Sequence, residues 1–290
     1  MTPVMTNAPL VHVVADISFS RLPELAADVI ERLHSELLEV GFPERIDATR
    51  QAVEVVLGQS ETEKQAEQKV AQIKRLVFRN PGKTRLVEFT QNQLEGTGRL
   101  NLKVTDYLGK DEFFKVLEQL LGIFKAHLPQ LGKTALKGIT LNYVDLIVPA
   151  GEQTLNSLVT AEICPPQLSA VNNQKFLFGS SFRLMETARD QGLRVAFEEV
   201  RTNEGNLTKV LPDHLIEHDS RCGLSIQAKD HWWAIPTETY GILDTQHICQ
   251  LQQSPPLQDY DILTKFRELQ KACSSVFNAV TTEDARASWA

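Results

Sequence analysis

The order of apolar and polar residues along the chain predicts strands and helices, beginning with a strand at 10–19. In the helix that follows, the apolar residues recur at steps of three and four on one face: Leu22, Leu25, Val29, Leu33 and Leu37. Gly41 and Pro43 are expected to end this helix. Residues 51–57 alternate weakly, as in a strand, whereas 61–74 are rich in Glu, Gln, Lys and Ala, which favour a solvated helix.

The middle of the chain predicts a hairpin, a further strand, a long helix and another strand. Residues 76–90 alternate around Asn80-Pro81-Gly82-Lys83, a turn that is typical of a hairpin. Residues 98–105 have apolar side chains at every second position, which predicts a strand. From 111 to 128 the apolar residues return to helical spacing. Residues 139–148 then predict the clearest strand of the chain.

The second half repeats this order loosely, without a repeat of the residues themselves. Residues 176–201 predict a hairpin around a turn at 190–192. Shorter strands are expected at 222–228 and 231–235, and a longer strand at 241–251. Strands that arrive as consecutive hairpins favour an antiparallel sheet.

The chain is expected to close with a helix whose N-cap is Asp259. Thr281 and Asp284 resemble a capping box that starts a last short turn. Each half therefore predicts strands followed by a long amphipathic helix. The expected fold is α+β, with antiparallel sheet and helices packed across one face. Its two halves, 1–149 and 150–290, are expected either as two domains or as one continuous domain.

Composition narrows the class of protein. The 290 residues include 30 Lys and Arg against 37 Asp and Glu, a formal net charge of −7, and 42% are hydrophobic. Such a chain is too apolar to be disordered and too acidic to be a wholly basic nucleic-acid binder. No apolar run approaches about eighteen residues, and the start lacks a secretory signal. The four cysteines form no C-x-x-C pair, so we expect a cytoplasmic protein with free thiols and no membrane contact.

No catalytic constellation emerges from the motifs. His214, His218 and Cys222 are spaced four apart and are weak candidate metal ligands, and a solvated polar loop is the favoured interpretation. No G-x-S-x-G sequence suggests a nucleophile. The pair Gly96 and Gly98 lacks the other residues of a phosphate-binding loop. We therefore expect no cofactor and do not favour an enzyme.

A local reversal of charge stands out against the acidic total. The span 69–87 contains no acid, and apart from Lys69 its cations are Lys74, Arg75, Arg79, Lys83 and Arg85. A hairpin carrying them could bind a phosphate backbone or an acidic partner. An ordinary solvated face is the simpler interpretation, and Phe78 alone supplies no platform for base stacking.

Two further groups of residues are candidates for buried or exposed sites. Asp145 shares a strand face with apolar neighbours, and Asn142 lies on the same strand, so both are expected to be buried polar groups. A structural hydrogen-bonding role is favoured over catalysis. Trp232 and Trp233 follow His231, and alternation along a strand would bury one indole and expose the other as an interface anchor.

Three segments together resemble an uncharacterised prokaryotic family known as "sporadically distributed" proteins. They are Asn7-Ala8-Pro9-Leu10-Val11-His12-Val13-Val14, Asn142-Tyr143-Val144-Asp145-Leu146-Ile147, and the tail Phe277-Asn278-Ala279-Val280-Thr281-Thr282-Glu283 with Trp289 near the end. Against the family pattern, His12 replaces an acid and Asn142 stands where an Arg is frequent. The resemblance implies no activity, but scattered occurrence implies an accessory gene, as in antiviral defence or toxin–antitoxin loci.

These observations favour a non-catalytic protein-interaction module of an accessory complex, which binds a protein partner or a second copy of itself. The alternative is a nucleic-acid- or nucleotide-binding component, or a nuclease, that uses the hairpin at 69–87. A metal-dependent enzyme built on His214, His218 and Cys222 is a third, weaker hypothesis.

Overall fold

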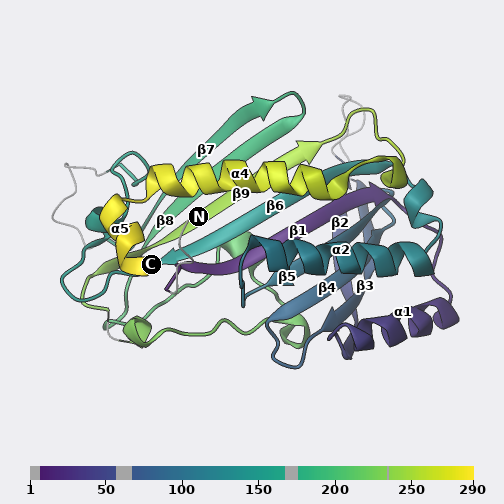
Figure 1. The fold of residues 1–290 in the computed structure, drawn as a ribbon, viewed down its shortest axis with the longest axis horizontal. Helices are drawn as coiled ribbons and strands as arrows, with labels where there is room; N and C mark the ends of the chain where they lie inside the picture. Colours follow the sequence, from purple (N-terminus) through teal and green to yellow (C-terminus); the bar gives the residue numbers. More distant parts are fainter. Residues whose placement is uncertain (1–6, 57–66, 167–175, 234) are drawn as a thin grey trace.

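The computed structural model describes residues 7–56, 67–166, 176–233 and 235–290. Nine strands form one antiparallel sheet in the order β2-β3-β4-β5-β1-β6-β9-β8-β7 (Figure 1). Their bounds are β1 Leu10–Ser20, β2 Glu44–Val56, β3 Glu67–Arg79, β4 Arg85–Asn92, β5 Thr97–Val104, β6 Leu136–Ile147, β7 Phe178–Ala188, β8 Gln191–Arg201 and β9 Thr239–Gln250. The prediction of an α+β fold with antiparallel sheet is therefore confirmed.

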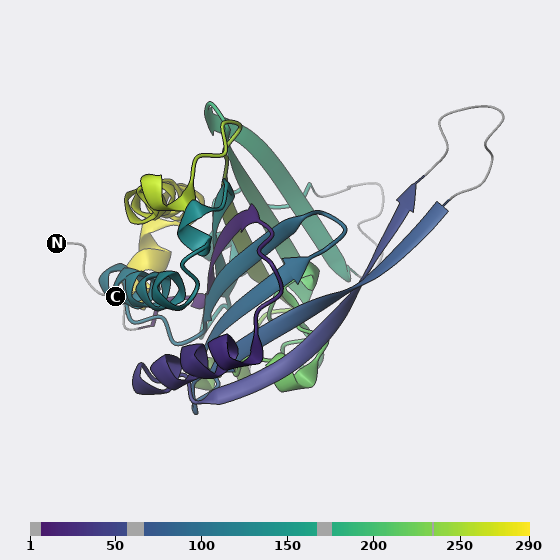
Figure 2. The same cartoon turned by 90° about the vertical axis from the view of Figure 1, so that its right-hand side faces the viewer.

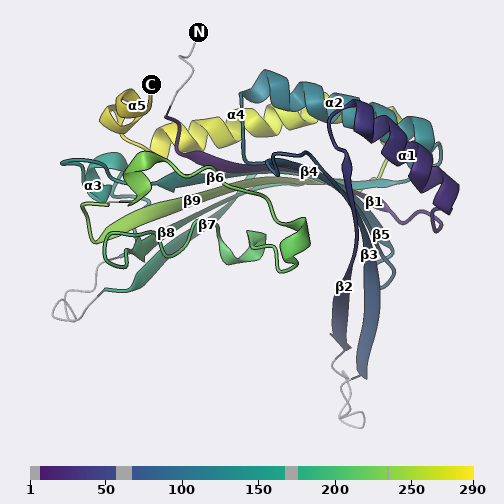
Figure 3. The ribbon, with the colours of Figure 1, turned by 90° about the horizontal axis from the view of Figure 1, so that it is seen from below.

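The helices gather on one side of this sheet (Figure 3). Three long ones lie there: α1 Ala27–Glu39, α2 Lys110–His127 and α4 Ile262–Val280. Two short helices, α3 Leu155–Leu158 and α5 Glu283–Trp289, lie at the end of the sheet near the C-terminus. On the opposite side the chain from 202 to 233, here called the covering segment, crosses the sheet as loops and short 3-10 turns. No helix among the described residues is long and apolar enough to cross a membrane.

β1 and β6, both within 1–149, pair with each other at the centre of the sheet. β1 is antiparallel to β6, with Ala15 opposite Leu141 and Ile17 opposite Ile139. From this pair the sheet extends through β5, β4 and β3 to the edge strand β2. On the other side β6 pairs with β9 of 150–290, and the sheet continues through β8 to the edge strand β7. The strands of 1–149 and those of 150–290 thus belong to one sheet.

Alternation along the central strands separates the two faces of the sheet. Val13, Ala15, Ile17 and Phe19 of β1 point toward the helices and are fully buried. Around them the largest apolar cluster joins the helix side of β3, β4, β5 and β6 to α1, α2 and α4. Burial of these faces at about 25 cal/mol per Å² is the main stabilising contribution to such a fold.

The structure corrects one expected helix. Residues 67–79 form strand β3, not the solvated helix predicted for 61–74, and residues 57–66 lie outside the described chain. β3 pairs with β2 from Glu67 to Arg79. The helix propensity of Gln, Lys and Ala is worth only fractions of about 1 kcal/mol per residue, so sheet pairing overrides it.

Two expected strands are also wrong. Residues 222–228 and 231–233 lie in the covering segment as coil and 3-10 turns, and residue 234 lies outside the described chain. Their backbone amides find partners in turns and loops, since the Cys222 amide donates to the Asp219 carbonyl, the Trp232 amide to the Lys229 carbonyl and the Ser225 amide to the Lys83 carbonyl. Short 3-10 turns form their own backbone hydrogen bonds, so these residues do not need to pair with a strand of the sheet.

The caps of the last two helices lie one or two residues from their predicted positions. Asp261, not Asp259, caps α4, because its carboxylate accepts a hydrogen bond from the Thr264 amide at 3.0 Å. Thr282, not Thr281, caps α5 and accepts from the Ala285 amide at 3.1 Å.

The Asp261 cap gives a direct test of where α4 begins. Asp261→Ala should lower the free energy of unfolding by about 1 kcal/mol, because the Thr264 amide loses its acceptor. Asp259→Ala is the matched control, since that exposed carboxylate makes no hydrogen bond in the described structure. Denaturant unfolding measures both changes. Equal effects of the two substitutions would contradict the assigned cap.

Candidate functional site

Two arginines of the most basic stretch of the sequence, Arg75 and Arg79, are buried. Arg75 of β3 is 7% exposed on the sheet face opposite the helices. Its guanidinium donates to Glu88 at 2.6 Å and, through two nitrogens, to Glu217 of the covering segment at 2.6 and 3.1 Å. Burial opposes the charge, but the two carboxylates raise the pKa of Arg75 overall, so it stays protonated.

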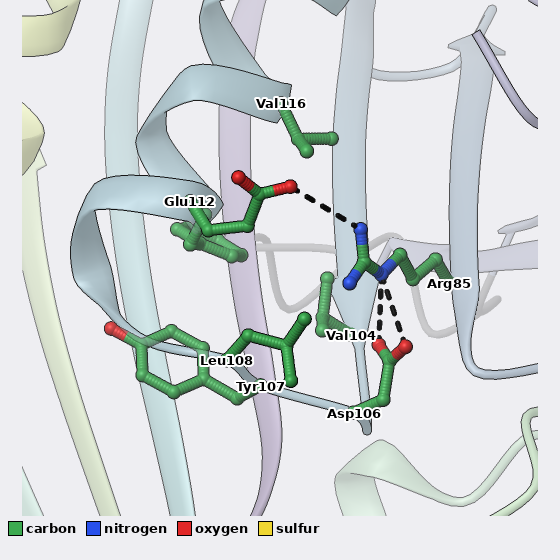
Figure 4. Close-up of a pocket in the computed structure, with 8 residues that line it drawn as sticks. Arg85, Val104, Asp106, Tyr107, Leu108, Glu112 and Val116 are labelled. Atoms are coloured by element: carbon green, nitrogen blue, oxygen red, sulfur yellow. Dashed lines mark hydrogen bonds and ion pairs between the residues drawn. The ribbon is translucent and has the colours of Figure 1, made fainter. Parts of the chain in front are cut away.

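Three other cations of this stretch also contact acids. Arg79 is buried and donates to Glu44 at 2.8 Å and to the Gly223 carbonyl at 2.7 Å. Lys74 forms an ion pair with Glu24. Arg85 donates to Asp106 at 2.9 and 3.2 Å, and Glu112 lies 3.9 Å away (Figure 4).

The small pocket beside Arg85 offers little space for a ligand. Its volume is about 10 Å³, which is about that of one water-sized probe (Figure 4). Lys83, in the turn after β3, is exposed and makes no ion pair within the described residues. Four of the five candidate cations are therefore already neutralised by acids that are distant in sequence, and anion binding by this hairpin stays a prediction.

A second group of paired charges lies across the same face, on the second half of the sheet. Asp244 of β9 is 2% exposed and accepts from Arg194 of β8 and Asn142 of β6, both at 2.6 Å. His214 of the covering segment lies 3.6 Å from the same carboxylate. Asn142 is thus a buried polar group, as predicted. Together with Arg75 and Glu88, these residues form what we call the polar layer.

The polar layer attaches the covering segment to both halves of the sheet. His214 meets Asp244 on β9, Glu217 meets Arg75 on β3, and the Gly223 carbonyl meets Arg79 at the end of β3. Arg75 and Asp244 would be costly to bury alone, because an uncompensated charge in the interior costs several kcal/mol. The contacts across the polar layer therefore fix the position of the covering segment, and they also give the buried charges of the sheet their partners.

The three candidate metal ligands do not form a site. Cys222 packs in a small apolar cluster with Ala48, Val77 and Leu86, while His214 and His218 are exposed. Among the described residues, no three His, Cys, Asp or Glu side chains are placed to share a metal ion. Burial also raises the pKa of all four thiols, which does not favour a reactive thiolate.

One histidine of the central strand is buried without a partner. His12 is 5% exposed, and neither ring nitrogen has a hydrogen bond in the described structure. Burial, with a smaller effect of Lys103, lowers the pKa of His12 to about 3. The imidazole is therefore neutral at physiological pH.

Asp145 lies on the helix side of β6, as its spacing predicts. It is 6% exposed, between Leu10 on β1 and Leu243 on β9. Its carboxylate makes no hydrogen bond or ion pair with the described residues, so the favoured hydrogen-bonding role has no counterpart there. Burial raises the pKa of Asp145 to about 7, opposed only by the charge of Lys229.

The tryptophan pair is divided between core and solvent. Trp232 is buried against the second-half sheet with Val144, Leu146 and Ile242, whereas Trp233 is 69% exposed. His231 precedes them in a 3-10 turn at Asp230–Trp233, so the division does not arise from strand alternation. Trp233 remains available as an interface anchor.

The largest concentration of exposed apolar side chains is on the edge strand β7 and the residues before it. Of the eleven large hydrophobic residues that are exposed in the described chain, six lie between 176 and 185. They are Phe176, Leu177, Phe178, Phe182, Leu184 and Met185. The hairpin predicted at 176–201 contains this strand, but its place at an edge depends on the order of strands.

The opposite edge of the sheet has a different character. The described side chains of β2 that are exposed are polar: Asp47, Thr49, Arg50 and Gln51. Charged edges of this kind discourage pairing with another chain. β7 also has two exposed charges, Arg183 and Glu186, but unlike β2 it exposes large apolar side chains beside them, so the two edges are not equivalent.

The polar layer predicts unequal effects of two arginine substitutions. Arg75→Met should destabilise the fold by about 3–5 kcal/mol, because Glu88 and Glu217 lose a buried partner. Arg45→Met is the matched control, since its partners Glu31 and Asp47 are well exposed, and it should cost less than about 1 kcal/mol. Urea unfolding would show equal losses if Arg75 were merely a surface ion pair.

Asp145 predicts a specific pH dependence. Its raised pKa means that the folded protein keeps a proton that the unfolded chain releases between about pH 4 and pH 7. Stability should therefore fall as pH rises through this window, by up to about 1.4 kcal/mol per pH unit. In Asp145→Asn this contribution should disappear. Unfolding curves with the same slope against pH in both proteins would refute the assignment.

The described surface therefore combines an internally paired polar layer with one edge strand, β7, that exposes large apolar side chains. Comparison with known proteins adds no assignment, since no family model matches the chain and no curated protein matches it.

Proposed function

We propose that the protein is a non-catalytic interaction module that receives an extended segment of a partner protein along β7. The observation that supports this proposal most strongly is the apolar, exposed edge strand. An edge strand presents unpaired backbone amides and carbonyls, which an incoming strand can pair with. Alternate side chains of that strand then select the partner.

The even-numbered residues of β7 supply the selective surface. Phe178, Phe182 and Leu184 share one face and are 50%, 59% and 64% exposed. The Arg194 guanidinium lies 5.5 Å from the Phe182 ring centre, and the Lys209 ammonium lies 5.7 Å from that of Phe178. These cation–π contacts hold the rings in place before binding, which lowers the entropy cost of association.

This surface predicts the chemistry of the partner. The incoming strand should have apolar residues at every second position, to pack on Phe178, Phe182 and Leu184. Trp233 could contribute a further anchor in the same complex. An accessory complex, of the kind implied by the family resemblance, is the context we propose. No specific observation favours the nucleic-acid alternative, because four of its five cations contact carboxylates.

The test is binding to the proteins encoded beside this gene. The wild-type chain should co-purify with one of them, and Leu184→Lys should lose this binding because a charge on β7 opposes strand addition. Leu108→Lys is the matched control, because Leu108 is 71% exposed at a site outside the sheet edge. It should bind as the wild type does.

Three results would contradict the proposal. One is retention of the partner by Leu184→Lys at wild-type affinity. The other is an equal loss in Leu108→Lys, which would indicate nonspecific hydrophobic contact. A chain that binds no neighbour and stays monomeric at every concentration would also refute it.

A further inference from the structure

A cavity separate from β7 lies on the helix side of the sheet. Its volume is about 140 Å³, and it is enclosed by the chain between β1 and α1, the start of α1, and strands β3 and β4. Figure 2 shows this connection running from β1 past these strands to α1. The Leu22 amide donates to the Gln91 side chain of β4 at 2.9 Å, and Glu24 pairs with Lys74 of β3. Both contacts fix the connection over the strands.

The walls of the cavity divide into an apolar part and a polar part. The apolar side chains are Leu22, Leu25, Ile30, Leu76 and Phe89. The charged ones are Arg21, Glu24 and Lys74, and three glutamines complete the lining. An apolar pocket with a few convergent polar groups is the usual form of a small-molecule site.

The charges favour an anion. Glu24 is neutralised by Lys74, whereas the Arg21 side chain forms no hydrogen bond or ion pair in the described structure. The lining therefore has one cation in excess. Gln91 also has a free donor, since its Oε1 accepts from Leu22 while its Nε2 is buried without an acceptor. A carboxylate supplies the acceptors that both Arg21 and the Gln91 amide lack.

The size of the cavity limits the rest of the ligand. Apolar cavities of about 150 Å³ bind benzene. A body of that size would contact Leu25, Ile30 and Phe89 while its charged end reaches Arg21. We propose that this cavity binds a small carboxylate with an apolar body the size of a single ring or a short branched chain.

Phenylacetate and its neutral counterpart 2-phenylethanol are suitable probes, to be titrated into the full chain and followed by methyl NMR. Phenylacetate should shift the methyl signals of Leu22, Leu25 and Ile30 in a saturable way. It should bind about tenfold more tightly than 2-phenylethanol, since a hydrogen bond to a charged group contributes about one such factor. Absence of these shifts, or equal affinity for the two probes, would overturn the proposal.

Substitutions test the polar and the apolar part of the cavity separately. Arg21→Gln, at an exposed position, should weaken phenylacetate about tenfold and leave 2-phenylethanol unchanged. Leu25→Trp should fill the cavity and abolish binding of both. Leu38→Trp is its control, because Leu38 is exposed on α1 away from the cavity lining, and it should bind both probes normally. Unchanged phenylacetate binding by Arg21→Gln would contradict the carboxylate assignment even if Leu25→Trp failed to fold.

Discussion

The antiparallel pairing of β1 with β6 is the constraint on which the rest of the molecule depends. Both strands lie within 1–149, and β6 pairs in turn with β9 of 150–290, so their register aligns helix-facing residues of both halves. Because the pair occupies the centre, the later strands of each half extend outward and leave β2 and β7 as the two edges. The long helices then share one face, and the covering segment takes the other (Figure 3).

The face opposite the helices is stabilised differently from the helix side. Its strands place Arg75, Glu88 and Asp244 in positions that are buried once the covering segment is in place. Each charge has a partner from a distant part of the sequence, so the layer makes the position of the segment specific. Because the charges of this face are already paired, few cations are free to bind an anion. The apolar edge at β7 and the cavity beside α1 are therefore the better candidate sites.

The sequence predicts those elements whose periodicity is long and regular. Helices α2 and α4 and the strands β1, β6 and β9 follow from spacing alone, whereas α1 begins only at Ala27, so Leu22 and Leu25 of the predicted helix lie before it. The prediction fails at β3, because pairing with β2 outweighs weak helix propensity, and in the covering segment, where short apolar runs form backbone hydrogen bonds in turns and with other loops. The contacts of the polar layer are harder to predict from sequence, since Glu217 lies 142 residues from Arg75 and no local pattern links them. Likewise, the exposure of Phe182 follows only from its place at an edge.

Hydrogen exchange of the free chain, measured strand by strand, tests the central claim of one continuous sheet with an open edge most directly. Amides of β1 and β6 should exchange only through global unfolding and with the same free energy, because both strands lie in the middle of the sheet and are paired on both sides. The outward amides of β7 should exchange far faster. Different free energies for β1 and β6, or protection of β7 equal to that of β6, would contradict this account.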